Sequence, residues 1–401
     1  MSNPALSPSA LDPDGFVERG RINGAANGPL AGVRLAVKDN IQVEGMAHTA
    51  GHPIFHDRTA GGHATIVQQL LALGATVVGV TRTDAGGFGV TTPGLANPVA
   101  PDRVIGGSSG GNAAALVGDH ADLAIGTDTG GSVRIPAACT GLVGFKPSHG
   151  LLSTDGVWPL APSLDHVGLM AGSVGTISTA FSWLTEAVRE ADETARPIRI
   201  GLGGGATWVR TPAVASRLAE AVERAEAAGH TVLPVELPDR DTVVATHGVL
   251  VLSECRAVYD GLSEEEIARL GRAAARALAL PALDEDLILR ARDIVVRVRA
   301  AMDRIFRLVD VVLTPALPVE PPKTTARRVT LGDREVPVLE ALVAETCLAN
   351  LVGSPAIVFP MEPTDRLDPV PFSVQLLGAY GADRRLLAAA ARLSDAMMCD
   401  D

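Results

Sequence analysis

Short apolar runs alternate with segments of helical spacing along most of the chain. Residues 33–37, 76–81 and 309–314 are runs of aliphatic and β-branched residues with few polar positions, a pattern typical of buried strands. Residues 64–73, between the first two runs, carry apolar positions at helical spacing and stop at Gly74. This alternation predicts a layered α/β fold with a mixed, mostly parallel sheet.

The same two patterns predict the remaining elements. Further helices are expected over residues 112–117, 176–191, 213–228, 261–278, 284–308, 338–351 and 384–397. Further strands are expected over residues 123–126, 198–201, 231–235, 356–359 and 372–376, the last two as antiparallel neighbours. Irregular segments are expected over 83–101, 150–168 and 324–337. A loop as long as the first is usually functional or mobile.

The domain organisation follows from where linkers could lie. Residues 1–30 are rich in Pro, Asn, Gly and Ser, which predicts a flexible lead-in. No linker divides residues 31–401, so we expect them to form one domain.

Composition narrows the classes of protein. The net charge of −12 and the lack of any Lys/Arg run argue against a nucleic-acid partner. The four cysteines are widely spaced, which predicts reduced thiols and no metal site. Neither a secretory leader nor a long uncharged apolar run is present. We therefore expect a cytoplasmic location and no membrane partner.

Two glycine-serine loops stand out in residues 104–147. The first reads GGSSGG and contains Ser108, and the second reads TGGS and ends at Ser132, 24 residues later. Glycine allows backbone N–H groups to approach a ligand closely. The predicted helix and strand between the loops could bring them together and place a nucleophile beside a proton relay.

A serine nucleophile needs a base, because its hydroxyl is weakly reactive until a neighbour accepts the proton. One of the nine histidines, the carboxylate of Asp128 or the amine of Lys38 could serve. Lys38 follows an apolar strand, and burial would favour its neutral form. The alternative for Lys38 is a solvated lysine at the end of a strand.

Two other motifs suggest different chemistry. Residues 107–111 match the G-x-S-x-G elbow, which would make Ser109 the nucleophile. Residues 201–206 match the G-x-G-x-x-A of dinucleotide sites, but 207–212 separate the glycines from the next helix. Four histidines could pair with Ser109, namely His149, His166, His230 and His247.

Taken together, the VKDN lysine, the GGSSGG loop and the GTDTGGSVRIP stretch resemble the amidase signature family. The likeness continues through GLVGFKPSHGLLSTDG to SLDHVG, with weaker echoes in DVVLTPALP and PFSVQLLGAY. The PSHG segment is nearest in pattern to the short indole-3-acetamide-hydrolase-like members. The resemblance implies an α/β/α sandwich.

The resemblance also implies a Ser-cisSer-Lys triad that needs neither cofactor nor metal. Ser132 would be the nucleophile, Ser108 the bridging serine after a cis peptide, and Lys38 the base. The oxyanion would be held by the N–H groups of Thr129, Gly130, Gly131 and Ser132. Asp128 and Arg134 would form a structural ion pair.

The substrate site can be predicted only in outline. The loops 83–92, 156–162 and 314–318 could line an acyl pocket, with Asp84, Phe88, Trp158 and Leu317 contacting substrate. The alternatives are core packing for the three apolar residues and a solvated turn for Asp84.

These features predict an amidase that hydrolyses a small-molecule carboxamide, and they leave a homodimer open. Two other functions share the fold. One is the hydrolysis of esters or carbamates, and the other is the glutaminase-type component of a tRNA-dependent amidotransferase. The short region before Lys38 argues against the second.

Overall fold

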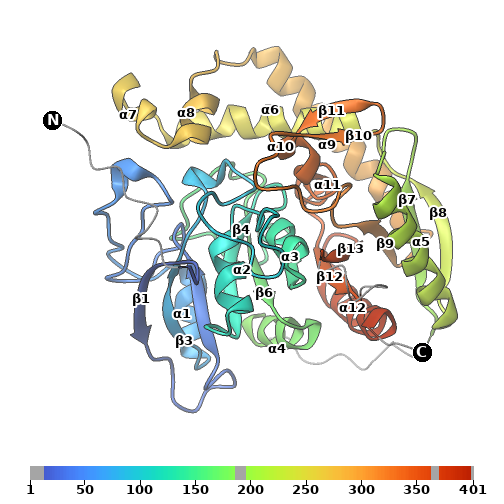
Figure 1. Ribbon diagram of the computed structural model, residues 1–401, viewed down its shortest axis with the longest axis horizontal. Coiled ribbons are helices and arrows are strands. Elements are labelled where there is room, and N and C mark those ends of the chain that lie inside the picture. The colour runs from blue at the N-terminus through green and yellow to red at the C-terminus, as the bar shows by residue number, and fades with distance from the viewer. Residues whose placement is uncertain (1–12, 186–195, 363–369, 399–401) are drawn as a thin grey trace.

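An eleven-stranded mixed sheet runs through the computed structural model, which describes residues 13–185, 196–362 and 370–398 (Figure 1). In sheet order the strands are β1 (Phe16–Ile22), β3 (Thr76–Thr81), β2 (Arg34–Lys38), β4 (Leu123–Asp128), β6 (His166–Ala171), β5 (Val143–Lys146), β12 (Ala356–Met361), β13 (Phe372–Leu377), β9 (Val311–Pro315), β7 (Arg199–Gly204) and β8 (Thr231–Glu236). The predicted layered α/β fold with a mixed sheet is confirmed.

Strand direction differs in part from the prediction. Of the ten neighbouring pairs in the described sheet, six are antiparallel: β1–β3, β4–β6, β5–β6, β5–β12, β12–β13 and β9–β13. The four parallel pairs are β2–β3, β2–β4, β7–β8 and β7–β9. The sheet is therefore not mostly parallel, because an apolar run reveals burial on both faces but not direction. The predicted antiparallel pairing of β12 with β13 is confirmed.

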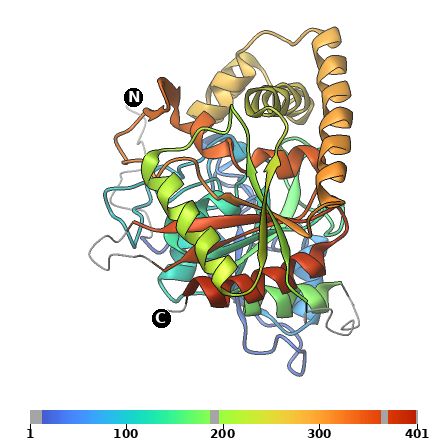
Figure 2. The same cartoon turned by 90° about the vertical axis from the view of Figure 1, so that its right-hand side faces the viewer.

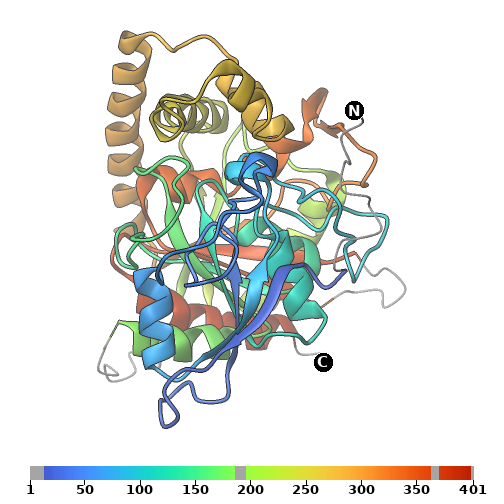
Figure 3. The same cartoon turned by 90° about the vertical axis from the view of Figure 1, so that its left-hand side faces the viewer.

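Helices cover both faces of the sheet (Figures 1 to 3). One face is packed by α1 (Thr65–Ala72), α4 (Val174–Leu184), α5 (Pro212–Ala227) and α12 (Asp383–Met398). The other is packed by α2 (Gly110–Val117), α3 (Arg134–Thr140), α6 (Arg240–Val258), α9 (Glu285–Phe306), α10 (Val338–Val343) and α11 (Cys347–Val352). Figures 2 and 3 show α4 and α12 on one side of the sheet and α6 and α9 on the other.

Alternation along β2 decides where Lys38 points. Leu35 and Val37 belong to the core beneath α1, α4 and α12, whereas Ala36 belongs to the core around α2 and α3. Successive side chains of a strand point to opposite faces. Lys38, the residue after Val37, therefore points toward the α2 and α3 side, where both glycine-serine loops lie.

Several predicted boundaries were wrong. Residues 16–22, expected in a flexible lead-in, form the edge strand β1 paired with β3, whereas residues 1–12 lie outside the described part. The expected helix 261–278 is divided into α7 (Glu264–Ala268) and α8 (Arg272–Leu278), because Gly271 between them has a φ of +107°. The predicted helix over 176–191 is α4 as far as Leu184, and its last six residues lie outside the described part.

Other elements were not predicted or differ from the prediction. The unpredicted ones include α3, α6, β5 and β6, and β6 begins inside the segment 150–168 that was expected to be irregular. Helix α6 has apolar residues around its whole circumference, because it packs against both α9 and α11, and so it lacks a one-sided pattern. Residues 324–337 include a hairpin of β10 (Arg328–Leu331) and β11 (Arg334–Pro337). The expected helix 338–351 is interrupted between α10 and α11, at Thr346. Two short 3-10 helices, η2 (Pro53–Phe55) and η3 (Ala85–Gly87), complete the described elements.

Phe145 provides a test of the core. Its ring meets that of Phe181 edge to face at 5.1 Å, and both side chains are buried. We expect Phe145→Ala to lower the free energy of unfolding by about 3–5 kcal/mol. Trp183, 50% exposed on the same helix as Phe181, is the control, and Trp183→Ala should cost less than about 1 kcal/mol. Denaturant unfolding of the two variants measures both, and equal losses would contradict the packing.

Candidate active site

Lys38 is fully enclosed at the end of β2. Its Nζ lies 2.8 Å from Ser108 Oγ and 2.8 Å from Thr127 Oγ1. Burial lowers the pKa of the Lys38 amine from 10.5 to about 7, although Asp84, Asp128 and Asp165 act in the opposite direction. At neutral pH a large share of this amine is uncharged, so it can accept a proton. The solvated alternative for Lys38 is wrong.

The GGSSGG loop brings Ser108 to the lysine. The Gly107–Ser108 peptide bond is cis, as the resemblance implied. No side chain fits at Gly107, because a Cβ there would lie 2.4 Å from the Asp84 carboxylate and 2.6 Å from the Thr91 nitrogen. The chain then enters α2, and Ser108 stays buried against β2.

The second loop joins β4 to α3 and lies against the first. The Ser109 N–H donates to the Ser132 carbonyl at 3.1 Å, which links the two loops directly. Ser132 is 8% exposed, and its hydroxyl has no hydrogen-bond partner among the described residues. The two predicted serine loops are therefore neighbours, and Ser132 is the more accessible of their key hydroxyls.

The expected oxyanion donors are not equivalent. The Gly131 N–H donates to Asp128 Oδ1 at 2.8 Å, so it is already engaged. The N–H groups of Thr129, Gly130 and Ser132 have no acceptor within the described part of the chain. Of the four predicted donors, these three are therefore free to bind a developing negative charge.

A buried ion pair fixes this loop. Arg134 Nη2 lies 2.8 Å from Asp128 Oδ1, and both side chains are fully buried. Burial alone would raise the pKa of the Asp128 carboxyl, but the Arg134 guanidinium holds it well below its usual range. Arg134 also donates to the Thr346 carbonyl, to Gln375 Oε1 and to Asn350 Oδ1 at 2.7–2.8 Å. The pair thus connects the serine loop to the C-terminal third of the chain.

Of the four residues predicted to contact substrate, two are buried in the protein and two are partly exposed. The buried carboxylate of Asp84 accepts hydrogen bonds from the N–H and hydroxyl of Thr92, which makes it part of the loop scaffold rather than a group directed at a ligand. Leu317 is buried in the core around α2 and α3. Phe88 and Trp158 are only partly buried, and both rings lie near Tyr259 at centroid distances of 6.1 and 6.3 Å.

This aromatic cluster of Phe88, Trp158 and Tyr259 is joined by short contacts to the segments that hold Lys38 and Ser108. The backbone N–H of Trp158 donates to the carbonyl of Asn40, two residues after Lys38, at 2.7 Å. A Cβ at Gly87, next to Phe88, would meet Leu160 at 3.5 Å and Ser108 Oγ at 3.7 Å. The backbone next to Phe88 therefore lies close to the Ser108 hydroxyl.

Sequence reasoning missed several groups of the site. Thr127 and Asn40 lie inside the quoted motifs, so their proximity to Lys38 could have suggested them: Asn40 Nδ2 donates to Thr127 Oγ1 at 3.0 Å. Thr346 and Asn350 come from distant segments without any local motif, and His247 was named only as a possible partner of Ser109. Only the fold brings these three residues to the second loop.

Both competing motifs lose support. Ser109 Oγ is buried and has no partner among the described residues, so no histidine activates it there. The glycines of 201–204 lie within β7, and α5 begins only at Pro212, which leaves no glycine loop on a helix N-terminus.

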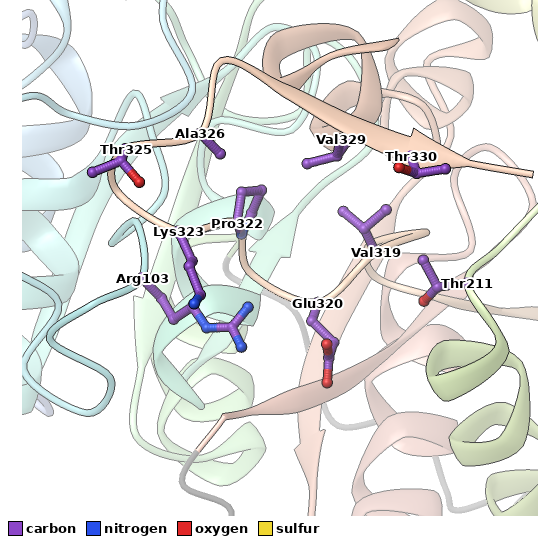
Figure 4. A pocket seen from close by; sticks show the side chains of 10 residues that line it. All are labelled: Arg103, Thr211, Val319, Glu320, Pro322, Lys323, Thr325, Ala326, Val329 and Thr330. Atoms are coloured by element: carbon purple, nitrogen blue, oxygen red, sulfur yellow. The ribbon is translucent and has the colours of Figure 1, made fainter. Parts of the chain in front are cut away.

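A separate open hollow of about 320 Å³ lies outside this site (Figure 4). It contains none of the predicted site residues. Its lining consists of Arg103, Thr211, Val319, Glu320, Pro322, Lys323, Thr325, Ala326, Val329 and Thr330. Elsewhere, the described residues contain no cluster of three or more metal-binding side chains and no helix able to span a bilayer.

Comparison with known proteins agrees with this geometry. The model of the family described as Amidase matches residues 16–387. A glutamyl-tRNA(Gln) amidotransferase subunit of Halobacterium salinarum is 34% identical over 94% of this chain and 98% of that protein. The corresponding protein of Thermus thermophilus is 35% identical over 92% of this chain and 85% of that protein.

Solved structures give the same result. A crystal structure described as an amidase superposes with a TM-score of 0.83 at 29% identity, covering 92% of this chain and 86% of that one. The glutamyl-tRNA(Gln) amidotransferase subunit of Thermotoga maritima superposes with a TM-score of 0.77 at 27% identity, covering 97% and 91%. The chain belongs to the amidase signature family, whose members are enzymes that act on C–N bonds.

The Asp128–Arg134 pair gives a second test. We expect Arg134→Met to cost about 3–5 kcal/mol, because it leaves a buried carboxylate unpaired. Arg199→Met, which removes a bridge to Asp310 from a 46% exposed side chain, should cost about 1 kcal/mol or less. Because the folded pKa of Asp128 is depressed, the stabilisation is present above the ordinary carboxyl pKa of 3.8 and is lost below it. Urea unfolding of both variants at pH 7 measures the loss in free energy of unfolding. Similar losses in Arg134→Met and Arg199→Met would contradict the predicted importance of the buried pair.

Proposed function

We propose that this enzyme hydrolyses a carboxamide to a carboxylic acid and ammonia through an acyl-serine intermediate. Ser132 is the nucleophile, Ser108 relays its proton, and Lys38 is the base. The observation that carries the proposal is the fully buried Lys38 amine, with its pKa lowered to about 7, at 2.8 Å from Ser108 Oγ. Such an amine supplies the base that a serine hydroxyl needs.

The contacts of Lys38 suggest how the relay is oriented. A neutral amine has hydrogens to donate and one lone pair to accept with. Thr127 Oγ1 takes an amine hydrogen at 2.8 Å, which leaves the lone pair for the hydroxyl of Ser108. Ser108 gives its proton to Lys38 and takes the proton of Ser132 as Ser132 attacks the carbonyl carbon.

The remaining steps produce the carboxylic acid and ammonia without a cofactor. The oxyanion of the tetrahedral intermediate is held by the N–H groups of Gly130 and Ser132. The relay returns a proton to the amide nitrogen, the C–N bond breaks, and ammonia leaves an ester on Ser132. Water, deprotonated by the same relay, attacks that ester and releases the acid.

Two kinds of carboxamide are candidate substrates. The amidotransferase relatives favour a glutamine-type amide. The short N-terminal region does not argue against this role, since the Halobacterium protein is covered over 98% of its length. The second candidate is a small apolar amide, and the aromatic cluster beside Ser108 favours it. Glutamine has a zwitterionic end that apolar rings do not bind well.

Lys38 should determine the pH dependence. The catalytic form is the neutral amine, so we expect kcat/KM to rise tenfold per pH unit below about pH 7 and to level off above it. Lys38→Ala should lose most activity together with this dependence. A stopped assay across pH 5–9 measures it, and undiminished activity with a flat profile in Lys38→Ala would exclude the lysine as the base.

Labelling distinguishes the two neighbouring serines. A fluorophosphonate should modify Ser132, and Ser132→Ala should abolish both labelling and turnover. Ser109→Ala is the matched control from the adjacent loop, and it should remain labelled. Mass spectrometry of the modified peptide locates the adduct. Labelling at Ser109 together with an active Ser132→Ala variant would favour the G-x-S-x-G interpretation instead.

Ammonia release separates the two substrate candidates. L-Glutamine and phenylacetamide are compared at equal concentration with the purified chain, then with the other components of an amidotransferase added. Glutamine hydrolysis that rises when these components are added supports the first candidate. Efficient hydrolysis of phenylacetamide by the chain alone, with glutamine inert in both conditions, supports the second.

A further inference from the structure

The backbone of the second serine loop is fixed by hydrogen bonds to its carbonyl groups. Each carbonyl from Asp128 to Gly131 accepts a hydrogen bond from outside the reacting groups. The four donors, in order, are Asn350 Nδ2 at 2.8 Å, His247 Nε2 at 2.9 Å, Thr346 Oγ1 at 2.5 Å and the Ile135 N–H at 2.6 Å.

Peptide planarity converts these bonds into directions for the N–H groups. A carbonyl and the next residue's N–H share one plane and point in opposite directions in a trans peptide. The donor on Thr129 O therefore aims the Gly130 N–H, and the donor on Gly130 O aims the Gly131 N–H at Asp128. Only the first of these two N–H groups is available to substrate.

The donor that aims Gly130 is His247, a residue of α6. The acceptor is a carbonyl, so Nε2 must carry the hydrogen. Burial lowers the pKa of the His247 imidazole, which keeps the ring neutral in this tautomer. The ring rests directly on the loop, because a Cβ at Gly130 would lie 2.8 Å from its Cε1 and Nε2.

We infer that His247 is a positioning residue that aims and polarises the Gly130 N–H toward the oxyanion of the reaction. A hydrogen bond accepted by one end of a peptide strengthens donation from its other end. The inference rests on the proposed function, since an oxyanion must form beside Ser132. Through His247, helix α6 would also contribute to the site, although no sequence motif marks this helix.

The test compares the rate of fluorophosphonate modification, which needs no knowledge of the substrate. We expect His247→Leu to lower that rate and the kcat for phenylacetamide or L-glutamine about 10- to 100-fold, because a misdirected donor loses part of its contribution. KM and the pH midpoint set by Lys38 should stay unchanged. His247→Gln, which retains an N–H donor, should recover most of the rate.

His230→Leu is the matched control. His230 is also buried with a lowered pKa, and it accepts a hydrogen bond from the Ile198 N–H beside edge strand β8. This variant should react like the parent. If His247→Leu does not fold, His247→Asn replaces it, because asparagine is too short to reach the Thr129 carbonyl. The rate of fluorophosphonate modification and the kcat of that variant then test the inference.

The outcomes separate the two proposals. If Ser132→Ala remains active, the proposed function fails. If Ser132→Ala is inactive while a folded His247→Leu or His247→Asn keeps its rates within about twofold, only the role of His247 is overturned. A change confined to KM would overturn it as well, because it would mean binding of the ground state.

Discussion

Desolvation of one amine is the constraint on which the rest of the site depends. A lysine in water is charged at neutral pH and cannot take a proton, whereas burial at the end of β2 lowers the pKa of Lys38 to about 7. That burial requires cover from both sides. The sheet supplies β3 and β4 as neighbours of β2, and the first glycine-serine loop closes the remaining side with Ser108. The packing that forms the fold around β2 therefore also sets the pKa of the Lys38 amine.

The second constraint is the Asp128–Arg134 pair, which makes a short loop depend on distant parts of the chain. Asp128 orients the Gly131 N–H, and Arg134 binds groups near residues 346, 350 and 375. An ion pair buried this deeply adds little net stability compared with apolar packing, but it penalises any arrangement that leaves one partner alone. Its consequence here is the single position that it imposes on the second glycine-serine loop, which carries the proposed nucleophile.

The sequence predicted most of what is local and little of what is long-range. Lys38, Ser108 and Ser132 lie in motifs with glycines whose spacing is informative. Most of the buried strands have clear apolar runs, although the buried strands β5 and β6 were not predicted. Strand direction, the break at Gly271 and the edge strand β1 depend on partners that no window of sequence contains. His247 was considered only as a partner for Ser109, because its actual acceptor, the Thr129 carbonyl, belongs to a backbone whose position depends on the whole fold.

Three acids surround Lys38, the proposed base, and each of them favours its charged form. Asp84, Asp128 and Asp165 each favour the charged lysine, yet each is occupied by another donor: Thr92 for Asp84, Arg134 for Asp128 and Thr129 for Asp165. Burial raises the pKa of the Asp84 and Asp165 carboxyls, while their hydrogen bonds act in the opposite direction. Desolvation therefore prevails over attraction at Lys38. The three acids thus fix the loops of this site through their bonds to Thr92, Arg134 and Thr129, while their attraction for the amine stays smaller than the effect of its burial.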